Sequence, residues 1–166
     1  MKDEAKNQLN NILGNYDEKL AESERRAAEI RAAQESFPKR FSALRTETIR
    51  PALEEFAELL SARGHEAVAR EQEESSSRAG GVSLAAIILR VVPKPFARKS
   101  GETSANFIEV TFSANRQERR ITVASTNTIA NSGGSRGKRG EYEIDAVTAD
   151  VVVSHVLQAL QEGLVV

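Results

Sequence analysis

The sequence contains no cysteine and no tryptophan, and its only aromatic residues are two tyrosines and six phenylalanines. Without cysteine the chain can form no disulfide, no thiolate nucleophile and no cysteine-based metal site. Because a lack of cysteine fits a reducing compartment, we expect a cytoplasmic protein. Hydrophobic residues still make up 40% of the chain, so a core built mainly from Val, Ile, Leu and Ala is expected.

The sequence also lacks a long hydrophobic run. The longest apolar stretch, Leu84 to Leu89, is far shorter than the roughly 20 residues that span a membrane. The first residues, MKDEAKNQL, are charged and contain no apolar segment of the kind found in a signal peptide. We therefore expect no membrane partner.

The formal net charge of −1 conceals a segregation of charge along the chain. Residues 78–140 hold 11 Lys or Arg against three Asp or Glu, whereas residues 141–166 hold five acidic residues and no Lys or Arg. This asymmetry permits a basic face. The same charges can instead be solvated on several faces, or be paired with the acidic C-terminal segment.

A helix is predicted for most of residues 3–63, because Ala, Glu, Lys, Arg, Leu and Gln dominate there. Alternating steps of four and three residues connect its apolar positions, which is typical of a coiled coil. Ser23 and Gln34 are the two polar residues in this stripe. Its other members are Leu9, Leu13, Tyr16, Leu20, Ala27, Ile30, Phe37, Phe41 and Leu44. Three arrangements would bury this stripe. It can pack between copies in a homodimer or higher homo-oligomer, within one chain in a helical hairpin, or against a helix of another protein.

Two of the four prolines fall within this helical region. Pro38 lacks an N–H and should break or kink the helix, giving either a hairpin or a kinked rod. The apolar stripe continues through Pro38 without a change of phase, which favours the rod. At Pro51 the apolar phase shifts by one residue, which indicates a bend where the helix leaves the coiled-coil-like stalk and packs on the β domain. Arg63 in the last turn and Gly64 just after it predict that the helix ends here.

The remainder of the chain is predicted to be a small α+β domain. Strands are expected at 65–73, as an edge strand, and at 82–92, 107–112 and 119–128, where residues are apolar or alternate. A final helix is expected from Ala149 to Glu162, with Thr148 as its N-cap. The predicted fold is therefore α+β, with a helical region at 1–63 and a domain at 64–166. That domain is a four-stranded antiparallel meander packed against the C-terminal helix.

The segment from Asn131 to Gly140 is rich in glycine and in positive charge, and is predicted to be a loop. Glycines allow backbone N–H groups to point at an anion. The segment is not a P-loop, because the required spacing of glycine and the Ser or Thr after Lys138 are absent. The candidate contacts to an anion or nucleic acid are Lys94, Arg98, Lys99, Gly133, Gly134, Arg136, Lys138 and Arg139. A mobile basic loop that aids solubility, or a loop that contacts a protein partner, would have the same composition.

No catalytic or metal-binding pattern is present in the sequence. His65 and His155 are the only histidines, and their spacing from Ser and from carboxylates matches no nucleophilic or metal-ligand arrangement. We expect no cofactor and no metal ion, and the pattern points away from an enzyme.

The function favoured by these patterns is a non-enzymatic interaction module. It would self-associate through its N-terminal helices and present its β domain to an unidentified protein partner. Two alternatives are nucleic-acid binding through a basic face of the β domain, and binding of an anion or small molecule by the glycine-rich segment.

Overall fold

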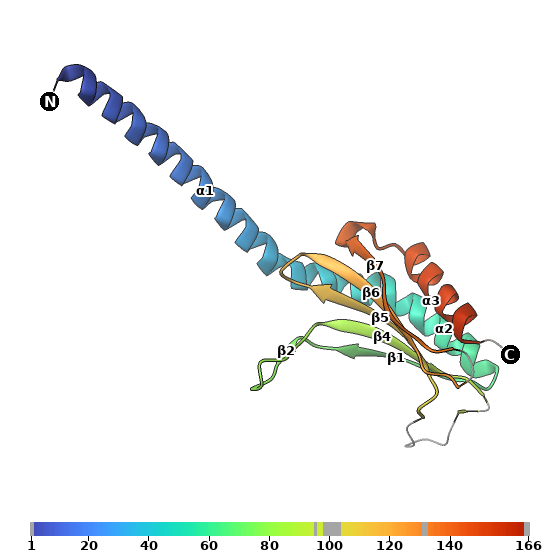
Figure 1. Cartoon of the computed structure of the whole chain (residues 1–166). Helices are drawn as coiled ribbons and strands as arrows, with labels where there is room; N and C mark the ends of the chain where they lie inside the picture. Colours follow the sequence, from blue (N-terminus) through green and yellow to red (C-terminus); the bar gives the residue numbers. More distant parts are fainter. Residues whose placement is uncertain (1, 95, 98–103, 131–132, 165–166) are drawn as a thin grey trace. The chain divides into compact units, whose positions relative to one another are not determined.

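The computed structural model describes residues 2–94, 96–97, 104–130 and 133–164, and its elements are labelled in Figure 1. The chain divides into two compact units, Met1–Phe37 and Pro38–Val166. The first consists of helix and the second combines helices with a sheet, so the α+β fold expected from the sequence is correct. The first unit ends well before residue 63, where the sequence suggested a boundary.

Helix α1 runs from Asp3 to Leu44 and contains Pro38. Helical structure then continues to Ala62, so a hairpin turn at Pro38 is absent from this described range, and the helix is continuous, as the unbroken phase of the stripe favoured. Proline removes one helical hydrogen bond and adds one steric clash. The many good helix formers on either side of Pro38 provide enough local bonding for the helix to continue.

A single π-helical turn, Arg45–Ile49, separates α1 from helix α2, Arg50–Ala62. Pro51 lies in the first turn of α2. A π turn contains one more residue than an α-helical turn, and this extra residue explains why the apolar phase of the sequence shifts by one before Pro51. Within the second unit, Phe41, Ile49 and Leu53 are almost completely buried.

The main sheet of the second unit has five antiparallel strands, not the four expected. The strands are β1 (Glu66–Gln72), β4 (Ala86–Val92), β5 (Ile108–Asn115), β6 (Arg120–Asn127) and β7 (Ser135–Glu143), in the spatial order β1-β4-β5-β6-β7. Strand β1 lies at one edge, as expected. The hairpin between β5 and β6 is also present.

The additional strand, β7, covers most of the segment that was predicted to be a loop. Its glycines and cations give it no apolar alternation, so the sequence carries no strand signal there. It pairs with β6 along its length, with a bulge opposite Val123 and Ala124. Edge strands with charged side chains are common, because charge discourages pairing with another chain. A separate two-stranded ribbon, β2 (Ser75–Ser76) and β3 (Val82–Ser83), lies between β1 and β4 in the sequence.

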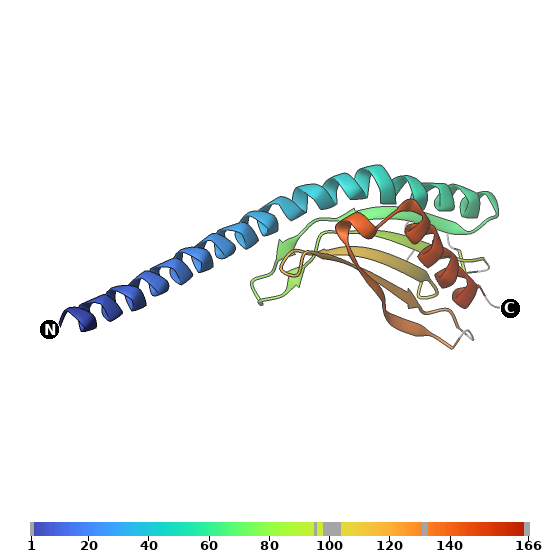
Figure 2. The ribbon, with the colours of Figure 1, turned by 90° about the horizontal axis from the view of Figure 1, so that it is seen from above.

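Both α2 and helix α3, Ala149–Gly163, lie on the same face of the sheet, as Figure 2 shows. The core is formed between this face and the two helices. Its main sheet residues are Ile87, Leu89, Val91, Ile108, Val110, Phe112, Ile121 and Val123. The packing of the C-terminal helix on the sheet was therefore correctly predicted, and so was the packing of the helix after Pro51 on the β domain.

The start of α3 matches the prediction closely. The Thr148 side chain accepts a hydrogen bond from the Val151 N–H at 3.3 Å, so it caps the helix. At the other end, Gly163 packs against the Ile108 side chain so closely that a Cβ there would overlap it. In the described part of the chain, no helix combines the length and the apolar character needed to cross a membrane.

Candidate interaction surfaces

The first unit exposes most of its apolar stripe. The exposed fractions are 43% for Leu9, 48% for Leu13, 61% for Tyr16, 43% for Leu20 and 49% for Ile30. The unit is one helix, and a single helix has no second element with which to cover its own apolar face. The exposed part of the stripe therefore remains available to a partner.

The C-terminal end of the predicted stripe is placed differently from the rest. Phe37 and Phe41 are buried, with exposed fractions of 3% and 1%, and Leu44 is half-buried. Phe41 belongs to the core of the second unit, where the guanidinium of Arg45 lies 5.6 Å from the centre of its ring. Of the predicted self-association residues, those from Leu9 to Ile30 thus form the exposed surface.

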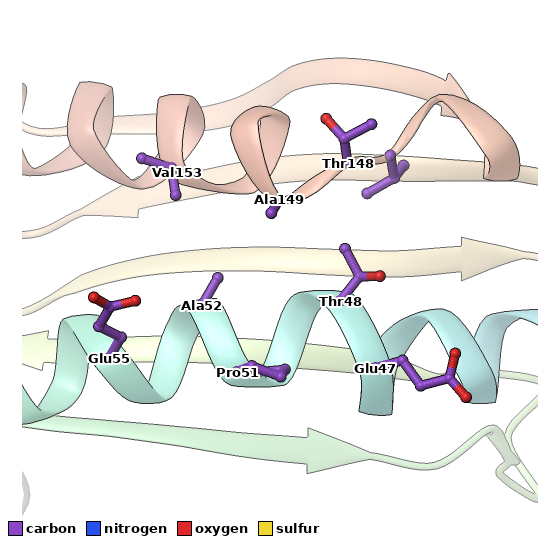
Figure 3. Close-up of a pocket in the computed structure, with 9 residues that line it drawn as sticks. Glu47, Thr48, Pro51, Ala52, Glu55, Thr148, Ala149 and Val153 are labelled. Atoms are coloured by element: carbon purple, nitrogen blue, oxygen red, sulfur yellow. The ribbon is translucent and has the colours of Figure 1, made fainter.

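A groove of about 570 Å³ lies between α2 and α3 in the second unit (Figure 3). Ala52 points from the lower helix in this view towards Ala149 of α3, and Thr48 points towards Thr148. Val153 of α3 also lines the groove. The groove is also lined by Glu47, Pro51, Glu55, Val147 and Thr148.

A second hollow of about 150 Å³ continues from the groove and shares residues with it, including Ala52 and Val153. Phe56 and Leu59 complete its apolar lining. Leu59 is 63% exposed, which is unusual for a large apolar side chain beside a hollow. We call the two hollows together the α2/α3 groove.

The charged side chains that line the α2/α3 groove are acidic. Glu47 lies at one end and Glu55 beside the shared apolar residues, and neither hollow is lined by Lys or Arg. An apolar floor with an acidic rim is complementary to a partner segment that carries both apolar and basic side chains. The sequence patterns gave no indication of this groove. The only local hint in the sequence is that apolar Phe56 and Leu59 lie close to acidic Glu55 on the same helix.

The candidate basic patch is only partly assembled by the fold. Arg98 and Lys99 lie outside the described residues. Lys94 follows β4, and Gly133 and Gly134 precede β7, with all three exposed at the same end of the sheet. Two strands, β5 and β6, separate β4 from β7, which corresponds to about 14 Å across the sheet.

The three cations of β7 point in different directions. Arg136 and Lys138 pair in register with Thr126 and Ala124, on the face opposite the helices, and the Lys138 ammonium lies 3.3 Å from Glu141. Arg139 falls at the bulge and turns to the helix side. Bulges commonly re-aim a side chain in this way.

Arg139 is held firmly beneath α3. Its guanidinium lies 2.7 Å from a carboxylate oxygen of Glu162, and its Nε donates to the Ser125 hydroxyl at 2.8 Å. The Lys138 ammonium also holds the pKa of the Glu141 carboxyl below its usual range. The structure therefore pairs two of the three cations with carboxylates, which weakens the case for a uniformly basic face that binds nucleic acid.

The backbone of the glycine-rich segment is also less free than a loop would be. From Ser135 onwards it pairs with β6, so the N–H groups on that side are engaged in the sheet ladder. Between Ser135 and Gly140, the N–H groups that pair with β6 are therefore not available to an anion.

The two histidines have different surroundings. The Tyr142 hydroxyl lies 2.6 Å from His155 Nε2, and the two rings meet edge to face with centroids 5.6 Å apart. Burial lowers the pKa of His155. Partial burial, followed by the charges of Lys94 and Arg63, lowers the pKa of His65. Among the described contacts, neither histidine has both a nucleophile and a carboxylate beside it. The described residues as a whole form no cluster of three or more side chains that could hold a metal ion.

A buried arginine connects the helical segment to the sheet. Arg45, in the π-helical turn, is only 6% exposed. It donates to the carbonyl oxygens of Gln72 and Ala86, and its Nη2 lies 2.8 Å from Glu73. These contacts tie the helical segment to the edge of the sheet.

Comparison with known proteins adds no family to this description. The chain matches no protein-family model, no curated protein and no solved structure.

Proposed function

We propose that this protein is a non-enzymatic interaction module that self-associates through the apolar stripe of α1 and binds a protein partner in the α2/α3 groove. The exposed stripe carries the proposal. Five large side chains, from Leu9 to Ile30, are each more than 40% exposed on one side of a helix. Burial of the surface that each still exposes would contribute about 1 kcal/mol.

Self-association also provides the helix with the packing that it lacks alone. In proteins most helical stability comes from burial of an apolar face, and an isolated helix is only marginally stable in water. A second stripe of the same kind supplies a matching apolar surface, which supports a homo-oligomer as the functional form.

Particle mass in solution tests this part of the proposal. Leu20→Asp and Ile30→Asp each place a charge in the centre of the buried stripe, and each should reduce an oligomer to monomers in light-scattering or ultracentrifugation measurements. Asn11→Asp is the matched control, because it adds the same charge to the same helix outside the stripe, and it should leave the mass unchanged. A wild-type chain that is monomeric at high micromolar concentration would contradict the proposal.

The α2/α3 groove is proposed as the site for the partner. Its apolar floor and its acidic Glu47 and Glu55 fit a segment that presents apolar residues flanked by Lys or Arg. Apolar grooves of several hundred Å³ are of the size that binding sites occupy.

Two synthetic amphipathic peptides, one with leucine and lysine and one with leucine and glutamate, provide a direct probe. The lysine peptide should bind, and amide chemical shifts should change around Ala52 and Val153. Glu47→Lys combined with Glu55→Lys should abolish that binding, whereas Glu4→Lys combined with Glu18→Lys on α1 should preserve it. Equal binding of both peptides, or shift changes confined to the uncovered sheet face, would exclude the groove as the site.

A further inference from the structure

The steps of the stripe on α1 define two kinds of position. Leu13, Leu20 and Ala27 occupy positions called a, and Leu9, Tyr16, Ser23 and Ile30 occupy positions called d. Each d is followed by a step of four residues to the next a, and each a by a step of three to the next d. Two copies of this helix can pair in parallel or antiparallel directions. The two directions bring different residues together.

The polar residue Ser23 favours one of them. In a parallel pair aligned in register, each d position faces the same d position of the second copy, so Ser23 faces Ser23 and the two hydroxyls can bond to each other. In an antiparallel pair the order of the steps is reversed, and each d faces an a. In the antiparallel alignments centred on the stripe, Ser23 would face Leu13 or Leu20, and its hydroxyl would meet an apolar side chain.

The charges beside the stripe point the same way. Lys19 and Arg26 immediately precede a positions, whereas Asp17 and Glu24 immediately follow d positions. In a parallel pair, a residue that precedes an a position lies beside the residue five places further along the second copy. Lys19 of each copy then lies beside Glu24 of the other, and the pair of charges is attractive.

One parallel contact is unfavourable. The same rule places Arg26 beside Arg31 of the second copy. The structure shows Arg26 in contact with Glu22 of its own helix, at 2.5 Å, and this carboxylate offsets its charge. Antiparallel alignments centred on the stripe instead place residues of the same kind together, basic against basic and acidic against acidic. These alignments bring Lys19 beside Arg26 or Lys19, and Asp17 beside Glu24 or Asp17.

We propose that the stripe of α1 binds a second copy of this chain in the parallel direction and in register, with Lys19 of each copy paired to Glu24 of the other. This inference rests on the self-association proposed above and adds the partner's direction and alignment.

The absence of cysteine makes a direct test available. Ser23→Cys introduces the only cysteine of the chain, at a d position and with almost no change in size. In the parallel arrangement the two sulfur atoms face each other, so mild oxidation of the full-length protein should convert most of it to covalent dimers. Asn11→Cys, on the outer side of the same helix, is the matched control and should remain uncrosslinked.

A charge exchange provides the second test. Lys19→Glu places two like charges together in the parallel arrangement and should weaken self-association about tenfold at low salt. Adding Glu24→Lys restores the attraction and should recover wild-type affinity. In the antiparallel alignment that places Lys19 beside Arg26, Lys19→Glu would strengthen association, and in the one that places Lys19 beside Lys19 it would leave association nearly unchanged.

The outcomes separate the two proposals. If the protein is oligomeric but Ser23→Cys does not crosslink, and Lys19→Glu does not weaken association, the parallel direction is wrong and self-association stands. If the protein is monomeric, both proposals fail.

Discussion

At the scale of single residues, burial separates two arginines that both form ion pairs. Arg45 is buried and bonds to two backbone carbonyls as well as to carboxylates. Arg40 contacts Asp145 at 2.7 Å, but its side chain is half exposed and Asp145 is 88% exposed. Solvent screens the exposed pair, whereas the loss of Arg45 removes a donor from the buried Ala86 carbonyl and from the partly buried Gln72 carbonyl.

Replacing each arginine with methionine measures this difference. Arg45→Met should lower the free energy of unfolding by about 3 kcal/mol, and Arg40→Met by less than about 1 kcal/mol. Urea denaturation followed by circular dichroism gives both values. Equal effects would mean that the contacts of Arg45 contribute no more than a surface pair.

His155 makes stability depend on pH near neutrality. Burial lowers its pKa from the ordinary value of 6.5, so the unfolded chain binds a proton at a higher pH than the folded protein does. The contribution of His155 to stability is therefore fully present above pH 6.5 and declines as the pH falls below it.

The comparison of wild type with His155→Gln isolates this effect. Between pH 7.5 and pH 5.5 the wild-type free energy of unfolding should fall, and the variant should show a smaller fall. Part of the slope should remain, because the pKa of His65 is lowered as well. Identical slopes in the two proteins would show that His155 does not contribute.

At the scale of elements, the close packing of α3 on β5 depends on Gly163. A Cβ at this position would overlap the Ile108 side chain, so Gly163→Ala should lower the free energy of unfolding by about 1 to 3 kcal/mol. Gly14→Ala is the control, since no atom lies within 4 Å of a Cβ there. It should stabilise α1 by up to about 1 kcal/mol. Thermal denaturation of both variants distinguishes the two cases, and a neutral Gly163→Ala would refute the packing argument.

The elements also show why some of the fold could be predicted and some could not. The start of α3 was predictable because Thr148 is a local signal. The shift in the spacing of apolar residues before Pro51 is caused by the extra residue of the π-helical turn, although the sequence analysis interpreted it as a bend. Strand β7 was missed because its pairing with β6 is a tertiary effect, and its residues, such as Gly137 and Lys138, have low strand propensity. The α2/α3 groove arises only when two helices distant in sequence pack together.

At the scale of the whole molecule, the division into two units predicts that the second unit folds without the first. A chain that begins at Glu35, three residues before the second unit, should unfold cooperatively with unchanged stability, because it retains the buried Phe37 and all core residues of Pro38–Val166. It should also be monomeric, since it lacks the exposed stripe. Calorimetry and ultracentrifugation of this shortened chain test both statements. An oligomeric product would show that the second unit has its own association surface.

The position of the stripe at one end of the chain has a consequence for affinity. If two copies pair through α1, every assembly carries two α2/α3 grooves. A partner that has two binding segments on one chain would engage the second groove at a raised effective concentration, so its avidity would exceed its affinity for a single groove by up to several orders of magnitude. Such an assembly would discriminate between partners by their valency as well as by their sequence.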